Sequence, residues 1–194
     1  MEKQPIHIVW FKRDFRLVDN EVLFHAHQSG VPLLLVGFFE PSVMKYPDSD
    51  VRHWRFVYES IQDLNKKLQP SNSKVYFFHE EVKAIFSELI KEYDVKTVFS
   101  HQEIGNQLTF DRDIAMKEFF QSNDITWKEF QMHGVIRRLK SRQEWDKRWE
   151  QVMRDTPKMI QESELNTILL RPNLYDTIKG PDLPIEITKI GRAS

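Results

Sequence analysis

The sequence predicts an α/β domain: a doubly wound, Rossmann-like, mostly parallel sheet of five strands with helices on both faces. Two observations predict it. First, short and almost continuously apolar runs recur, as in strands that are covered on both faces. These runs are residues 6–11, 32–39, 74–78, 96–100 and 125–130. Second, the segments between them carry apolar residues at helical spacing. Repeated strand–helix–strand units form right-handed crossovers and therefore a parallel sheet.

The helices follow from their apolar stripes. The clearest covers residues 50–69, where Trp54, Ile61 and Leu64 fall on one face. Residues 82–90 and 110–120 repeat the pattern. After the first strand, either Asp19 or Asn20 can accept backbone N–H groups as the N-cap of a further helix.

The character of the chain changes after residue 130. We expect the α/β domain to occupy residues 1–131. Residues 132–194 are expected to hold a basic segment, a short helix over 143–154 and a tail with four prolines and little periodicity, which is either a linker or an irregular wrap. The sequence stops without a closing element, which favours a truncated protein.

Composition restricts the function classes. The 194 residues include no cysteine, which excludes disulfides, cysteine-ligated zinc and a cysteine nucleophile. With 28 basic and 29 acidic residues the net charge is −1, so the chain as a whole carries no excess of positive charge that would attract nucleic acid. The amino terminus lacks the pattern of a signal peptide, and no apolar run is long enough to span a membrane. We therefore expect a cytoplasmic protein without membrane contact.

Common catalytic and phosphate-binding motifs are missing. The first strand is followed by no GxGxxG, and the sequence has no Walker A, HExxH or GxSxG motif. Its seven histidines are scattered, so no metal site is predicted.

The sharpest signal is the segment 10–20, WFKRDFRLVDN. From its residues alone it predicts a strand end, a loop of alternating charge and a helix start. Arg13, Asp14 and Arg16 are close enough in sequence to form a local ion-pair network.

The same segment resembles the opening motif of the photolyase/cryptochrome family. The matching residues are Trp10, Phe11, Lys12, Asp14, Arg16, Asp19 and Asn20. Further matches at residues 38–41, Arg52 and residues 112–113 extend the resemblance over about residues 6–130. One departure is the longer stretch between residues 101–106 and Arg112.

The resemblance implies a light-dependent flavoprotein. In this family the N-terminal domain can hold an antenna chromophore: methenyltetrahydrofolate, a deazaflavin or a flavin. A separate helical C-terminal domain binds FAD. The resemblance implies that this domain is absent from the chain and that residues 132–194 include the linker toward it. The full-length protein would be a deoxyribodipyrimidine photolyase, a carbon–carbon lyase that repairs pyrimidine dimers in damaged DNA. This chain would contribute no catalytic residue and be inactive alone. The alternatives are a cryptochrome signalling photoreceptor and a stand-alone nucleotide-binding module.

A doubly wound sheet binds ligands beyond the carboxyl ends of its strands, at the switch point. The family resemblance points to the same edge. The candidate antenna pocket therefore consists of Lys12, Phe38, Glu40, Arg52, Gln102 and Glu103.

One basic cluster lies outside this pocket. It combines Arg137, Arg138, Lys140, Arg142, Lys147 and Arg148 with Trp145 and Trp149. Three interpretations stay open: the tryptophans pack inward beneath solvated cations, the cluster docks against the helical domain, or it binds single-stranded nucleic acid.

Overall fold

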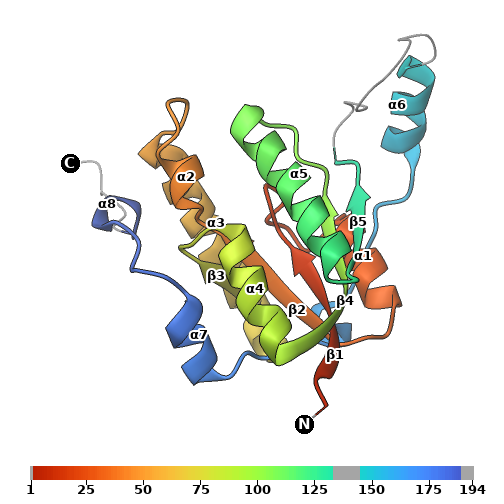
Figure 1. Ribbon diagram of the computed structural model, residues 1–194. Helices are drawn as coiled ribbons and strands as arrows, with labels where there is room; N and C mark the ends of the chain where they lie inside the picture. The colour runs from red at the N-terminus through yellow and green to blue at the C-terminus, as the bar shows by residue number, and fades with distance from the viewer. Residues whose placement is uncertain (1, 133–144, 189–194) are drawn as a thin grey trace.

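The computed structural model describes residues 2–132 and 145–188. Its centre is a five-stranded sheet in the order β3-β2-β1-β4-β5, with every neighbouring pair parallel (Figure 1). The strands are β1 (Gln4–Trp10), β2 (Leu33–Phe38), β3 (Val75–Phe78), β4 (Tyr93–His101) and β5 (Thr126–Phe130). All five predicted strands and the predicted fold class are confirmed.

Helices cover both faces of the sheet. On one face α1 (Glu21–Gln28) and α3 (Val51–Leu68) bury Val22, Leu23 and Leu64 against the strands. On the other face α4 (Val82–Glu92) and α5 (Gln107–Ser122) bury Phe86 and Phe120. The short helices α2 (Pro41–Met44) and η1 (Gln69–Ser71) flank α3. Because α1, which follows β1, and α5, which follows β4, pack on opposite faces of the sheet, the switch point lies between β1 and β4.

Side-chain caps begin three of these helices. Asn20, Asp50 and Asn106 each accept a hydrogen bond from a backbone N–H in the first turn of α1, α3 and α5. Of the two N-cap candidates for α1, Asn20 is the one used. Asp19 instead takes a left-handed conformation with φ 52° at the turn before it.

After β5 the described chain resumes with α6 (Trp145–Arg154), which projects from the sheet at the end of β5 (Figure 1). Residues 155–188, here called the strap, then run around the domain. They include η2 (Glu162–Glu164), α7 (Pro172–Ile178) and α8 (Ile185–Thr188). No helix of the described residues is long and apolar enough to cross a membrane.

The strap is packed against the domain. Thr167 forms a parallel bridge with Leu33 at the start of β2, and Leu165, Leu170 and Ile187 are buried in three different apolar clusters. The strap thus takes part in the hydrophobic core, although the domain boundary expected near residue 131 stays a prediction.

A glycine allows the strap to pass close to the end of β3. Gly180 has φ 79°, and a Cβ there would lie 2.1 Å from the carbonyl oxygen of His79. Beside it, the backbone N–H of His79 donates to the carbonyl of Lys179 at 2.7 Å. A side chain at position 180 would force these two segments apart.

Two adjacent leucines of the strap test its contribution to stability. Leu170 is 4% exposed and Leu169 is 45% exposed. We expect Leu170→Ala to lower the free energy of unfolding by about 2–4 kcal/mol, since it leaves a cavity in the core. Leu169→Ala should change it by less than about 1 kcal/mol. Chemical denaturation of both variants checks this, and equal effects would show that the strap does not share the core.

Candidate functional site

A buried carboxylate organises the loop at the switch point. Asp14 is 2% exposed and follows β1. Its Oδ2 lies 2.6 Å from Nδ1 of His101 at the end of β4, and its Oδ1 accepts from the backbone N–H of Lys12 at 3.0 Å. Asn20, the cap of α1, donates to Asp14 Oδ2 at 3.2 Å. One side chain therefore joins β1, β4 and α1.

These partners replace the local ion-pair network expected among Arg13, Asp14 and Arg16. That expectation was wrong. Arg13 binds Glu103 instead, and Arg16 donates to the carbonyl oxygen of Asp19. Burial acts to raise the pKa of Asp14, but the hydrogen bond and charge of His101, together with backbone N–H donors such as that of Lys12, outweigh it and lower the pKa.

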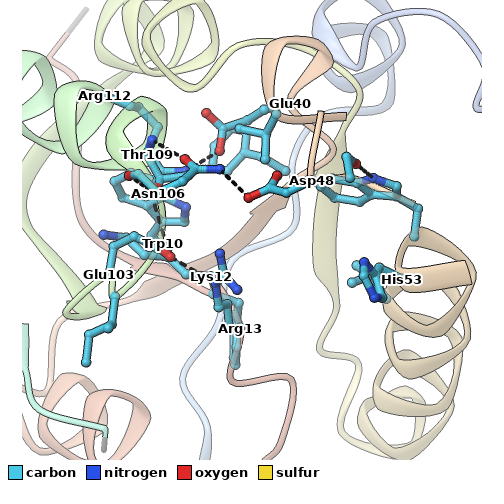
Figure 2. A pocket seen from close by; sticks show the side chains of 18 of the residues that line it. Trp10, Lys12, Arg13, Glu40, Asp48, His53, Glu103, Asn106, Thr109 and Arg112 are labelled. Atoms are coloured by element: carbon cyan, nitrogen blue, oxygen red, sulfur yellow. Dashed lines mark hydrogen bonds and ion pairs between the residues drawn. The ribbon is translucent and has the colours of Figure 1, made fainter. Parts of the chain in front are cut away.

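A cleft of about 600 Å³ lies beyond the carboxyl ends of β1, β2 and β4. Its walls are the loop after β1, the start of α3 and the β4–α5 segment (Figure 2). Its lining includes aromatic and polar side chains: Trp10, Phe15, Phe38, Trp54, Lys12, Arg13, Glu40, Asp48, His53, Glu103, Asn106, Thr109 and Arg112. This size falls in the range of small-molecule sites.

Ion pairs hold the inner side of the cleft. Arg112 of α5 pairs with Glu40, with Asp113 at 2.9 Å and with Glu103 at 3.4 Å. Lys12 pairs with Asp113 at 2.8 Å and lies 4.4 Å from the ring centroid of Trp10. The cations and carboxylates of this region are therefore matched, and the aromatic rings pack among them.

Burial shapes the protonation of these groups. The pKa of Lys12 is lowered by burial and by the charge of Arg112, against the opposing effect of Asp113. The pKa of Glu40 is raised, because burial outweighs its pairing with Arg112. Burial disfavours the charged form of Arg112 as well, but the carboxylates of Glu40, Asp113 and Glu103 raise its pKa.

Four of the six predicted pocket residues line this cleft: Lys12, Phe38, Glu40 and Glu103. The structure places the other two elsewhere. Arg52 is 82% exposed and pairs with Asp50, while the backbone N–H of Gln102 donates to the carbonyl of Phe130. Neither is among the lining residues. Which of the six bind a chromophore stays a prediction.

Sequence reasoning missed several cleft residues. Arg112 was noted as part of the family resemblance, yet its central place in the ion-pair network was not predicted. His53 and Trp54 come from the first turn of α3, and Asp48 and Asn106 join the walls through a hydrogen bond of 3.0 Å. The position of Asn106 as a helix cap close after β4 was a usable signal.

The structure describes only part of the basic cluster. Arg137, Arg138, Lys140 and Arg142 lie outside the described residues, as does the side chain of Arg148. Lys147 is exposed on α6, where Trp145 and Trp149 are exposed and stacked with ring centroids 6.4 Å apart. The interpretation with both tryptophans packed inward is therefore wrong for the described part of the chain.

The fold and the cleft define a class: doubly wound α/β domains that carry a cleft at the switch point, where such sheets bind ligands. Within that class the chain belongs to the DNA photolyase family, whose model matches residues 7–159, and it corresponds to the N-terminal α/β domain of photolyases and cryptochromes.

Individual relatives are distant. The chain is 31% identical over 104 residues to Blue-light photoreceptor PHR2 of Arabidopsis thaliana, covering 51% of this chain and 23% of that protein. It is 28% identical over 108 residues to Cryptochrome DASH of Synechocystis sp., covering 53% and 22%. The chain thus matches less than a quarter of the length of either relative.

Solved structures agree in fold. The archaeal photolyase from Sulfolobus tokodaii, solved with two FAD molecules, superposes with a TM-score of 0.68 at 18% identity, over 93% of this chain and 43% of that chain. The Synechocystis sp. PCC6803 cryptochrome gives a TM-score of 0.71 at 19% identity, over 94% and 40%.

The buried Asp14 predicts a defined pH dependence. Asp14→Asn should lower the free energy of unfolding by about 1–3 kcal/mol at neutral pH, since it weakens a buried charge-assisted contact. The pKa of Asp14 is lower in the folded chain than in the unfolded chain. At pH values between these two pKa values, the unfolded chain therefore binds more protons than the folded chain. This contribution is therefore present above the ordinary pKa of an aspartate and is lost as pH falls through the lowered one.

Urea denaturation at several pH values between neutral and acidic measures this effect. Asp63→Asn serves as the control, because Asp63 is exposed and, within the described residues, its ion pair is with Lys67 of its own helix. Parallel pH profiles for the wild type and Asp14→Asn would contradict the expected linkage.

Proposed function

We propose that this chain is the antenna-type domain of a deoxyribodipyrimidine photolyase-like flavoprotein and that its cleft binds the antenna chromophore. The observation that carries the proposal is the cleft itself. The chain belongs to the DNA photolyase family, and the cleft is a partly apolar space at the switch point of its sheet. Light-driven repair of pyrimidine dimers, with FAD as cofactor and damaged DNA as substrate, is proposed for the full-length protein.

The lining residues fit a flat heterocycle. Phe15 and Trp54, which are partly exposed, supply aromatic surface, and Asn106 offers a short polar group. Both carboxylate oxygens of Glu103 already take part in ion pairs, with Arg13 and Arg112. Glu103 therefore positions cations, and any contact of its own with a ring edge would share these oxygens.

FAD would belong elsewhere. The described residues form one α/β unit with its strap and contain no second, helical domain. We therefore propose that the catalytic FAD and an intramolecular contact with its domain lie outside the part of the protein that the structure describes.

A cryptochrome photoreceptor is the second candidate. Supporting it, both curated relatives described above carry photoreceptor or cryptochrome names. The two functions share this domain and its cleft, so they differ in whether the full-length protein repairs DNA.

Filling the cleft should abolish chromophore binding. Val43 lines the cleft and is half-buried, so Val43→Trp would place a large ring in the space. We expect at least a tenfold loss of affinity for whichever of methenyltetrahydrofolate, a deazaflavin or FMN binds, since about 1.4 kcal/mol corresponds to tenfold. Fluorescence titration measures it.

Arg52→Ala tests the remaining part of the predicted pocket in the same titration. A loss with Arg52→Ala and none with Val43→Trp would place the chromophore at the outer start of α3 and contradict binding in the cleft. A thermal melt of both variants shows that they are folded.

Repair separates the two candidate functions. The full-length FAD-containing protein, illuminated with blue light, should convert a cyclobutane or (6-4) dimer in an oligonucleotide back to pyrimidines, as followed by chromatography. The 194-residue chain alone should leave the dimer unchanged. Light-induced flavin reduction without repair would favour the cryptochrome.

A further inference from the structure

One cation of the cleft differs from the others in exposure. Lys12 and Arg112 have side chains that are 3% and 15% exposed, and both are matched by carboxylates. Arg13, in the loop after β1, is 56% exposed and lines the same cleft. Its guanidinium is therefore the accessible one of the three.

Arg13 is held at one point of its guanidinium. Its Nε donates to Oε1 of buried Glu103 at 2.8 Å, and among the described residues this is its only hydrogen-bond partner. The two Nη groups of the guanidinium can therefore donate hydrogen bonds to a ligand. Two parallel N–H groups suit a phosphate or carboxylate, which accepts them as a pair.

The β4–α5 loop is shaped to admit this arrangement. A Cβ at Gly105 would lie 2.3 Å from Oγ1 of Thr109, 2.8 Å from Oε1 of Glu103 and 3.2 Å from Nη2 of Arg13. A larger residue at position 105 would first meet the hydroxyl of Thr109 and the carboxylate of Glu103 and would crowd the guanidinium. Gly105 therefore leaves room for the Arg13–Glu103 pair, and Glu103 orients the guanidinium beside the cleft.

The neighbouring acid at this edge is engaged. Asp48, which also lines the cleft, accepts a hydrogen bond from Nδ2 of Asn106. Arg13 and His53 reach the cleft from different elements, the loop after β1 and α3 (Figure 2). The partly exposed rings of Phe15 and Trp54 line the same cleft, so a ligand whose anionic group meets Arg13 would find aromatic surface there.

We propose that Arg13 is a specificity-determining residue of the cleft: its guanidinium binds an anionic tail, phosphate or carboxylate, of the chromophore. The cleft then selects flat heterocycles that carry such a tail over the same heterocycles without one. This inference rests on the proposed chromophore binding and adds the part of the ligand that is recognised.

Riboflavin and FMN provide the matched pair, because they share the ring system and ribityl chain and differ in one phosphate. The dissociation constants of both are measured by fluorescence titration for the wild type and Arg13→Gln. We expect the wild type to prefer FMN by about tenfold, as for a charge-assisted hydrogen bond. Arg13→Gln should bring the ratio near one, and added salt should reduce the wild-type preference.

Arg52→Gln is the matched control. Arg52 is likewise tied through Nε to one carboxylate, Asp50, but it does not line the cleft. The Arg52→Gln substitution removes the same charge as Arg13→Gln and should leave the ratio of FMN to riboflavin affinity as in the wild type. Methenyltetrahydrofolate, titrated against the same three proteins, tests a carboxylate tail in place of a phosphate.

The outcomes separate the two proposals. A loss confined to FMN identifies phosphate as the recognised group, and a loss confined to the folate identifies carboxylate. Chromophore binding with equal affinities for FMN and riboflavin and no effect of Arg13→Gln on the folate would overturn the role of Arg13 and leave the proposed function standing. A ratio changed by Arg52→Gln instead would also overturn it. If no chromophore binds, the proposed function fails, and this inference fails with it.

Discussion

The geometry of the site depends on one buried aspartate at the point where the sheet changes direction. In a doubly wound sheet the loops after the two central strands leave on opposite faces, which opens a space between them. That space needs fixed walls if it is to bind a ligand. Asp14 provides them by joining the loop after β1 to His101 of β4 and to the cap of α1. Lys12, whose backbone N–H makes the contact with Asp14, and Arg13, which lies between the two, take their positions from this anchor.

The ion pairs beside the cleft fix the positions of side chains more than they stabilise the fold. Burying Lys12 and Arg112 removes them from water, and such pairs repay the desolvation only with good geometry and several partners. Here each buried cation has a carboxylate, and both contact the ring of Trp10. The result is an inner wall whose charges are matched. Arg13 also pairs with Glu103, but its guanidinium is exposed, which is why the proposed discrimination between ligands is assigned to it.

The fold could be predicted from the sequence because the strand and helix periods are strong, whereas the site could be predicted only in part. Lys12, Phe38, Glu40 and Glu103 lie at or just after the carboxyl ends of strands, and these ends meet at one edge of the sheet. Arg52 fails to line the cleft, although its neighbour His53 does, because adjacent helical positions differ by about 100° in direction. Similarly, the partners of Asp14 and Arg13 lie about 90 residues away, at His101 and Glu103, where sequence proximity gives no information.

The strap links the stability of the domain to the shape of its site. At its first end, the backbone groups of Lys158 bond the N–H and the side chain of Asp19, in the loop that carries Lys12 and Arg13. At its other end, Arg55 of α3 donates to the carbonyl of Glu186, and Ile187 packs with Phe39 and Ile61. The strap therefore contacts two walls of the cleft from outside while its middle pairs with β2. A change that loosens the strap should loosen both walls together, so cleft geometry and core packing form one cooperative unit.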